Sequence, residues 1–281
     1  MAKVLPPSGL TQHLQWNGVP IPKESYVRPL MSIDDIFRKG GVMLSANLHK
    51  TALYQMAMED IYPDGLIASL PELVEMQVTH TGAAPGLLIP FMSSSEELMG
   101  VDTRGMYTRI DGPLILVFHG AGLVTPDREE DSPDFIAKFT QDEFDELVSD
   151  GFEQKTGKVP IFSLNKLKEL GKVSLPRYGV AVPYDLSKIL GSGPIGLSTF
   201  TSNPLVIARA GGEEFLERYF NAMKAPFQPQ VAHEHVLSRV DFNTPRGVVL
   251  ESAGGFTIRT FTNPTGIPEP KYWVVRGHKN G

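Results

Sequence analysis

Three histidines stand where an imidazole could do chemistry. His119 opens the run His-Gly-Ala-Gly directly after the densest apolar stretch of the chain, residues 113–118. In open α/β sheets, ligands bind beyond the carboxyl ends of strands, and glycines at such a place let the backbone approach a ligand closely. We therefore predict His119 as a catalytic base or a metal ligand in a pocket. The alternative is a tight turn in which its ring caps backbone groups.

The other two histidines, His233 and His235, are separated by a single residue. Side chains two positions apart on a strand point to the same face, so both imidazoles could converge on one metal ion. We therefore expect a divalent metal as a candidate cofactor, with a third ligand from elsewhere in the chain. The candidates for that ligand are His119, His49, His80 and Asp241. The alternative is an exposed, polar start of a strand.

Both histidine patterns have partial counterparts in known families. The turn at His119 resembles the oxyanion-hole loop of α/β-hydrolases over four residues, but no Gly-x-Ser-x-Gly nucleophile elbow occurs in the chain. The His233–His235 pair resembles the His-x-His of cupin metal sites, but the glutamate and glycines that accompany that motif are absent. The chain is therefore assigned to neither family.

Other chemistries are excluded by composition or lack a motif. There is no cysteine, so thiolate nucleophiles, iron–sulfur clusters and cysteine zinc sites are excluded. Neither a dinucleotide fingerprint nor a phosphate loop occurs, so no cofactor-binding residues are predicted. A basic stripe with aromatic residues is also missing, and we therefore expect no nucleic-acid partner.

Charge is unevenly distributed along the chain. The net charge is −6, yet residues 127–153 alone carry eleven acids against two bases. We interpret this acidic segment as a solvated helical face. A docking surface for a basic partner and a divalent-cation site are the alternatives.

The helices and strands that position these residues can be predicted from hydrophobic periodicity, from helix-capping residues and from glycine or proline breaks. We expect helices over residues 32–38, 49–62, 70–76, 134–139, 140–148, 164–170, 186–190 and 213–223. We expect strands over residues 87–91, 113–118, 159–162, 178–183, 205–209, 234–240, 247–252, 256–262 and 272–276. The spacings of Ser94 with Glu97 and of Thr140 with Glu143 both suggest capping boxes at helix starts.

This order of elements predicts an α+β (mixed α/β) fold. We expect a single compact domain over residues 31–281, with a central mixed sheet, flanking short helices and a β-rich end. Residues 230–281 could form a β-rich subdomain. Residues 1–30 are rich in proline and are expected to form an extended arm through which the chain forms a homo-oligomer.

Three functions remain open at this level. The first is an intracellular enzyme, a metal-assisted hydrolase or lyase that acts on a small molecule in a histidine-centred pocket. The second is a non-catalytic structural or assembly protein, such as a virion, shell or filament subunit. The third is a small-molecule-binding module. Because the chain shows no signal peptide and no apolar run of about 18 residues, we expect a cytoplasmic protein without a membrane partner.

Overall fold

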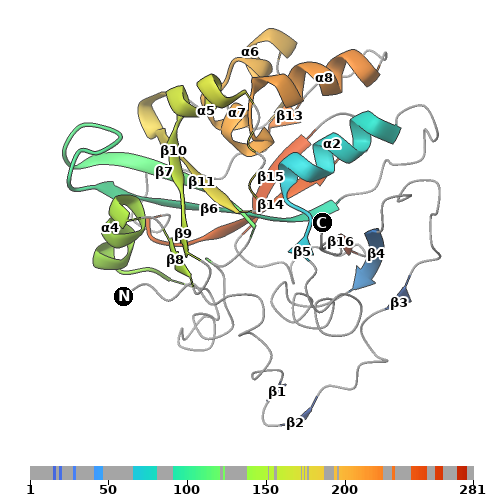
Figure 1. Cartoon of the computed structure of the whole chain (residues 1–281), viewed down its shortest axis with the longest axis horizontal. Coiled ribbons are helices and arrows are strands. Elements are labelled where there is room, and N and C mark those ends of the chain that lie inside the picture. The colour runs from blue at the N-terminus through green and yellow to red at the C-terminus, as the bar shows by residue number, and fades with distance from the viewer. Residues whose placement is uncertain are drawn as a thin grey trace.

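A long mixed β-sheet organises the chain in the computed structural model (Figure 1). The structure describes residues 15–16, 19–20, 28–29, 41–46, 66–80, 91–120, 123, 138–150, 152–154, 157–171, 173, 175, 177–186, 193–194, 196–223, 230–231, 242–251, 257–261 and 271–276. All structural statements below concern these residues.

The middle of the sheet is built from long antiparallel strands. Its centre is β6, Phe91–Asp102, which pairs with β7, Gly112–His119, on one side and with β14, Arg246–Glu251, on the other. Beyond β7 lies the antiparallel strand β11, Tyr178–Pro183, and then the parallel strand β10, Ile161–Ser163. The strand β6 is therefore hydrogen-bonded along both edges and lies in the interior of the sheet.

The sheet continues past β14 through shorter strands. In order these are β15 (Thr257–Phe261), β13 (Gln230–Val231) and β12 (Gly193–Pro194). A branch leaves the start of β6 through β16 (Lys271–Arg276), which also pairs with β4 (Gly41–Ala46) and β5 (Leu66–Ile67), and β4 pairs with β3 (Arg28–Pro29). Two small hairpins stand apart: β1 (Gln15–Trp16) with β2 (Val19–Pro20), and β8 (Phe152–Gln154) with β9 (Gly157–Val159).

Helices cover the central strands on both faces (Figure 1). On one face lie α2 (Leu70–His80), α5 (Leu164–Leu170), α6 (Leu197–Thr201), α7 (Pro204–Ala210) and α8 (Glu213–Met223). On the other face lies α4 (Gln141–Asp150). A short 3₁₀ turn, η3 (Tyr184–Leu186), follows β11.

The alternation of β7 creates a core on each face of the sheet. Ile115 and Val117 point to one face, and Leu114, Leu116 and Phe118 point to the other; all five are fully buried. The first set joins the upper core, which also contains Leu73, Val74, Val180, Val206, Leu216 and Tyr219. The second set joins the lower core, which also contains Leu98, Phe144, Leu147 and Ala181. A continuous apolar run was predicted to be a strand buried on both faces, and β7 confirms this.

Two local predictions are wrong. Residues 205–209 were expected to be a strand but form α7, because the Asn203 carboxamide caps the helix and Pro204 occupies its first turn. Ser94 and Glu97 were expected to start a helix but lie within β6, where neighbouring strands on both sides satisfy the backbone. The expected helices over 32–38 and 49–62 and the expected strand over 234–240 lie outside the described residues.

The predicted fold class is confirmed. The chain forms an α+β structure with a mixed sheet and flanking short helices as a single compact domain. In the part of the chain that the structure describes, no helix has the length and apolar character needed to cross a membrane.

Candidate functional site

The middle of β6 is polar although it is sealed from water. Five consecutive side chains are at most 1 % exposed: Ser93, Ser94, Ser95, Glu96 and Glu97. A buried polar group that lacks a hydrogen bond costs roughly 1–3 kcal/mol. These side chains must therefore find partners inside the protein, and their partners define the most polar place in the described interior.

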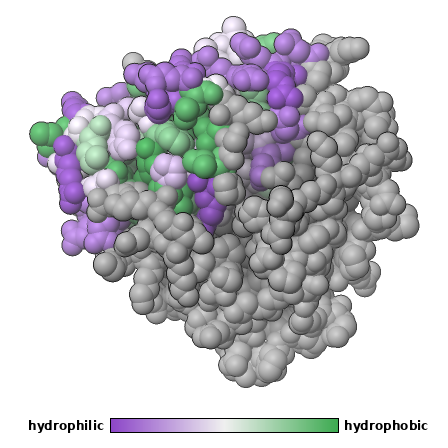
Figure 2. Space-filling view, viewed as in Figure 1, coloured by the Kyte–Doolittle hydropathy of each residue, from purple (hydrophilic) through white to green (hydrophobic). Residues whose placement is uncertain are grey.

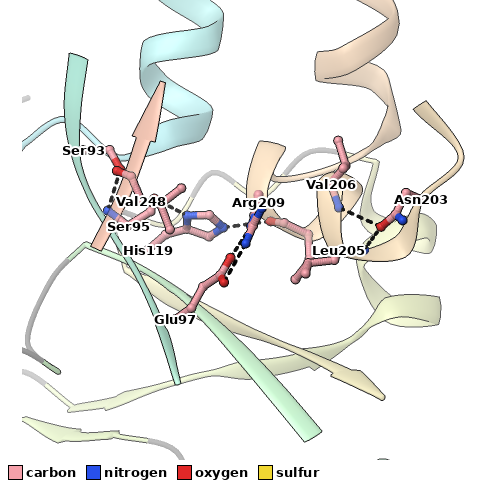
Figure 3. A network of polar contacts seen from close by, with 10 residues as sticks. Ser93, Ser95, Glu97, His119, Asn203, Leu205, Val206, Arg209 and Val248 are labelled. Carbon is pink, nitrogen blue, oxygen red and sulfur yellow. Dashed lines mark hydrogen bonds and ion pairs between the residues drawn. The ribbon is translucent and has the colours of Figure 1, made fainter. Parts of the chain in front are cut away.

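Strand alternation sends Ser93, Ser95 and Glu97 toward the upper core (Figure 3). The Ser93 hydroxyl donates to the Val248 carbonyl over 2.6 Å and accepts from the Ser95 N–H over 3.1 Å. This ties β6 to β14 through a side chain, in addition to the strand pairing. Glu97 and Ser95 make the two longer-range contacts described next.

Ser95 and His119 lie at the centre of a chain of hydrogen bonds. The Leu70 N–H donates to Ser95 Oγ over 2.9 Å, Ser95 Oγ lies 2.7 Å from His119 Nδ1, and His119 Nε2 lies 3.0 Å from the Ala208 carbonyl. A carbonyl can only accept, so Nε2 carries the ring proton, Nδ1 accepts and the Ser95 hydroxyl donates. The chain therefore links the start of α2, both central strands and the last turn of α7.

The surroundings of His119 keep its ring neutral. Its side chain is completely buried, and the Tyr178 ring lies 4.7 Å away between ring centroids. Burial lowers the pKa of His119 to about 4, although the hydrogen bond to Ala208 and the charge of Glu97 act to raise it. At neutral pH the imidazole is an uncharged ring with both nitrogens engaged inside the protein.

Glu97 is neutralised by a guanidinium from the far side of the sequence. Arg209, on α7, donates through Nε to one carboxylate oxygen and through Nη2 to the other over 2.8 Å. Both side chains are fully buried. Arg209 Nη1 has no hydrogen-bond partner in the described part of the molecule. Removing both charges from water costs free energy, and this cost is offset by the attraction between the two opposite charges and by their two hydrogen bonds.

Glu96 and Ser94 point to the opposite face of the sheet. The Glu96 carboxylate accepts from the Leu123 N–H over 2.7 Å. Phe118 is the strand partner of Glu96 on β7, and the Arg177 guanidinium lies over the Phe118 ring at 5.8 Å from the centroid, within the range of a cation–π contact. The Ser94 hydroxyl has no hydrogen-bond partner among the residues described.

The three predicted site residues are thus placed differently. His119 lies inside the upper core rather than at an open pocket, and a catalytic role for it stays a prediction that would need an opened interior and a broken hydrogen bond. His233 and His235 lie outside the described residues. Across the described ranges, no group of three or more histidine, aspartate or glutamate side chains could hold a metal ion.

Sequence reasoning did not place Ser95, Glu97 or Arg209 in a buried polar network. Five polar residues in a row between apolar neighbours were a usable signal for a special strand, but the spacing of Ser94 and Glu97 suggested a helix cap instead. Arg209 follows the apolar run 204–208, and an arginine so placed needs a carboxylate partner if it is buried.

Comparisons with known proteins identify a similar fold but no family. Neither a protein-family model nor a curated protein matches the chain. A solved structure, described as accommodation of massive sequence variation in Nanoarchaeota by the C-type lectin fold, matches with a TM-score of 0.58 and 19% sequence identity. The match covers 86% of this chain and 100% of that one. The architecture is therefore C-type lectin-like.

Proposed function

We propose that this chain is a non-catalytic binding protein, in which a rigid internal framework carries a recognition surface. The observation that carries the proposal is the state of His119, with both ring nitrogens hydrogen-bonded inside the protein and no exposed surface. A general base must reach the proton that it removes, directly or through one water. In the described state no substrate could meet this ring.

The buried carboxylate supports the same interpretation. Glu97 lies in a bidentate pair with Arg209 and shares the burial of His119. A catalytic acid or base must reach its substrate, whereas this carboxylate has both oxygens bound by one buried guanidinium. Ser95, Glu97, His119 and Arg209 together join both central strands to α2 and α7. We assign these four residues a structural role: they hold α2 and α7 against the central strands.

The fold likeness supports the second half of the proposal. The Nanoarchaeota structure is described as one in which the C-type lectin fold accommodates massive sequence variation. A fold whose stability rests on a buried network can change its surface residues at little cost, because surface substitutions usually alter stability by less than about 0.5 kcal/mol. We propose that in this chain too the buried network supplies stability while the surface residues supply recognition.

The proposal is tested by measuring turnover and binding on the same preparation. Chromogenic esters, phosphate esters, glycosides and peptides should show no turnover above buffer, with or without added zinc, manganese or iron. Immobilised glycan and protein panels should show saturable retention of the folded chain and none of the heat-unfolded chain. Turnover that disappears in a folded His119→Gln variant, or no retention on any panel, would overturn the proposal.

The competing metal-assisted enzyme has its own measurement. Elemental analysis after exposure to zinc, manganese or iron should give less than about a tenth of an equivalent for a metal-free binding protein. One equivalent that is lost when His233 and His235 are both changed to alanine would instead favour the predicted metal site. The control is a variant with alanine at Lys166 and Lys168, two exposed positions on α5.

A further inference from the structure

The loop between β6 and β7 projects from the end of the sheet, away from the upper core. It spans residues 103–111 and lies beside α4 at the left of Figure 1. Figure 2 shows an apolar group at this extremity of the described surface, bordered by hydrophilic residues. Loops at such places are commonly mobile, but hydrogen bonds to Asp102 and to α4 hold this one in place.

A buried carboxylate fixes the shape of the loop. Asp102 is 1 % exposed, and its two oxygens accept from the N–H groups of Met106, Tyr107 and Thr108 over 3.0, 2.7 and 3.0 Å. Its carbonyl also accepts from the Asp111 N–H over 2.9 Å. Burial alone would raise the pKa of Asp102, but these backbone donors outweigh it and hold the pKa below the ordinary value. The carboxylate is therefore ionised and fully engaged.

Side chains also fasten the loop to α4. Thr103 Oγ1 donates to the Asp145 carboxylate over 2.7 Å, and an Arg104 Nη donates to the Ser149 hydroxyl over 2.7 Å. Asp111 has a φ of +58°, a conformation that costs a non-glycine residue energy and persists only where the surroundings impose it. The loop and the helix thus form one rigid unit before any partner arrives.

The rigid loop holds apolar side chains in water. Met106 is 49 % exposed and Ile110 is 69 % exposed, and Arg104 and Arg109 are exposed between and beside them. We call these four residues the hairpin tip. Exposed apolar side chains on a pre-ordered loop bind at a low entropic cost, since the loop has already lost its freedom. The arrangement fits an anchor for a partner that offers an apolar contact rimmed by negative charge.

Such a negative surface lies next to the hairpin tip on the same molecule. Helix α4 carries five acids and no base: Asp142, Glu143, Asp145, Glu146 and Asp150. Asp142 is exposed. A basic, apolar tip and an acidic helix side by side make one self-complementary patch.

We propose that a second copy of this chain docks here, with the hairpin tip of each copy on α4 of the other. A twofold axis between tip and helix brings each patch onto its own equivalent, as closed dimers require. The contact pairs Arg109 with Asp142 of the second copy and buries Met106 and Ile110. An anionic membrane is the weaker occupant, because the acids of α4 beside the tip would repel it.

The apolar anchors are tested first. Analytical ultracentrifugation of the full chain should give a dimer, and changing both Met106 and Ile110 to aspartate should weaken dimerisation by at least about tenfold. Leu186→Asp and Leu197→Asp are matched controls, since these leucines are 56 % and 46 % exposed elsewhere on the surface. The controls should dimerise like the unchanged chain.

A charge exchange separates the proposed contact from a general loss of folding. Arg109→Glu should weaken the dimer, because it faces Asp142 of the second copy, and Asp142→Lys should weaken it for the same reason. Mixing the two variants should restore a mixed dimer, since every cross-contact then pairs opposite charges. Melting temperatures of the separate variants should stay close to that of the unchanged chain.

Four results of the dimerisation measurements would overturn the proposal. They are a monomer at concentrations of about 100 µM, a dimer indifferent to the aspartate changes, no recovery on mixing, and a dimer lost only when residues 1–30 are deleted. Binding of a monomer to phosphatidylserine vesicles through Met106 and Ile110 would count equally against it.

Discussion

Glu97 and Asp102 lie five residues apart on the same strand, and both carboxylates are shielded from water. They differ in what compensates their charge. Glu97 is met by the guanidinium of Arg209, 112 residues away in the sequence. Asp102 is met by three backbone N–H groups from residues four to six positions further on. One strand thus uses the same chemical group in two ways.

The difference assigns different tasks to the middle of β6, where Glu97 lies, and to its end at Asp102. A buried carboxylate whose cation comes from a distant helix is compensated only when strand and helix are packed together. Glu97 therefore couples the stability of β6 to that of the whole fold. A carboxylate that needs only its own loop shapes that loop and little else. Loss of the first partner should therefore weaken the global fold, and loss of the second should loosen a single segment.

The largest effect is expected for Arg209→Met. It leaves the Glu97 carboxylate buried without its cation, and such half-broken pairs cost about 3–5 kcal/mol of unfolding free energy. Urea unfolding followed by circular dichroism measures the loss. The double change of Glu97→Leu with Arg209→Met should recover most of it. A single variant as stable as the unchanged chain would mean that the pair does not couple sheet and helix.

As the pH falls, the contribution of His119 in the upper core should be lost before the contribution of Asp102 at the β6–β7 loop. His119 has a folded pKa of about 4 against an ordinary value of 6.5. Because the folded pKa is the lower one, the unfolded chain takes up the proton first. The unfolding free energy should therefore fall by about 3 kcal/mol as the pH drops from 6.5 toward 4. Asp102, whose pKa is also lowered, should lose its contribution only below about pH 4.

The control for this pH dependence is His119→Gln, in which an amide replaces the ring without a titrating group. Its unfolding free energy should change less across the same interval, even if its value at neutral pH is lower. Equal slopes for the two proteins would assign the acid sensitivity to other groups.

Asp102→Asn should have a smaller and local effect. The amide oxygen can still accept, but it loses the charge that strengthens the bonds from residues 106–108, at a cost of about 2 kcal/mol. Hydrogen exchange should accelerate at the N–H groups of Met106, Tyr107 and Thr108, whereas the amides of β7 should exchange as before. Uniform acceleration through the sheet would remove the distinction between the middle of the strand and its end at Asp102.

The smallest effect is expected at the hairpin tip itself. Replacing Met106 or Ile110 by alanine should change the unfolding free energy of the dilute, monomeric chain by less than about 0.5 kcal/mol, because both side chains are exposed. Thermal melts at low protein concentration measure this. A larger loss under those conditions would mean that the two side chains pack within their own molecule.

Local signals predicted much of this architecture. Helix α5 was expected over 164–170 and begins and ends there, since the Ser163 hydroxyl accepts from the Lys166 N–H and Gly171 stops the last turn. The capping box of Thr140 and Glu143 is also confirmed at the start of α4. In both cases the information lies within a few residues of the boundary that it marks.

The buried network could not be predicted in the same way. Ser94 and Glu97 have the spacing of Thr140 and Glu143, yet they lie in a strand, because pairing on both sides of β6 outweighs the local pattern. The contact of His119 with the Ala208 carbonyl spans 89 residues. A single sequence does not state which distant segments become neighbours, so the imidazole alone could not be distinguished from a catalytic one.

The hydrogen-bond chain from Leu70 to Ala208 has a fixed direction, because it begins at an amide and ends at a carbonyl. Only one tautomer of His119 satisfies it, and successive bonds polarise one another. The proton on Nε2 is therefore held within the interior and should exchange slowly with water. Its resonance in a nitrogen-edited NMR spectrum would report on the packing of these elements. The resonance should be present while α2, β6, β7 and α7 remain packed together and should disappear when any of them detaches.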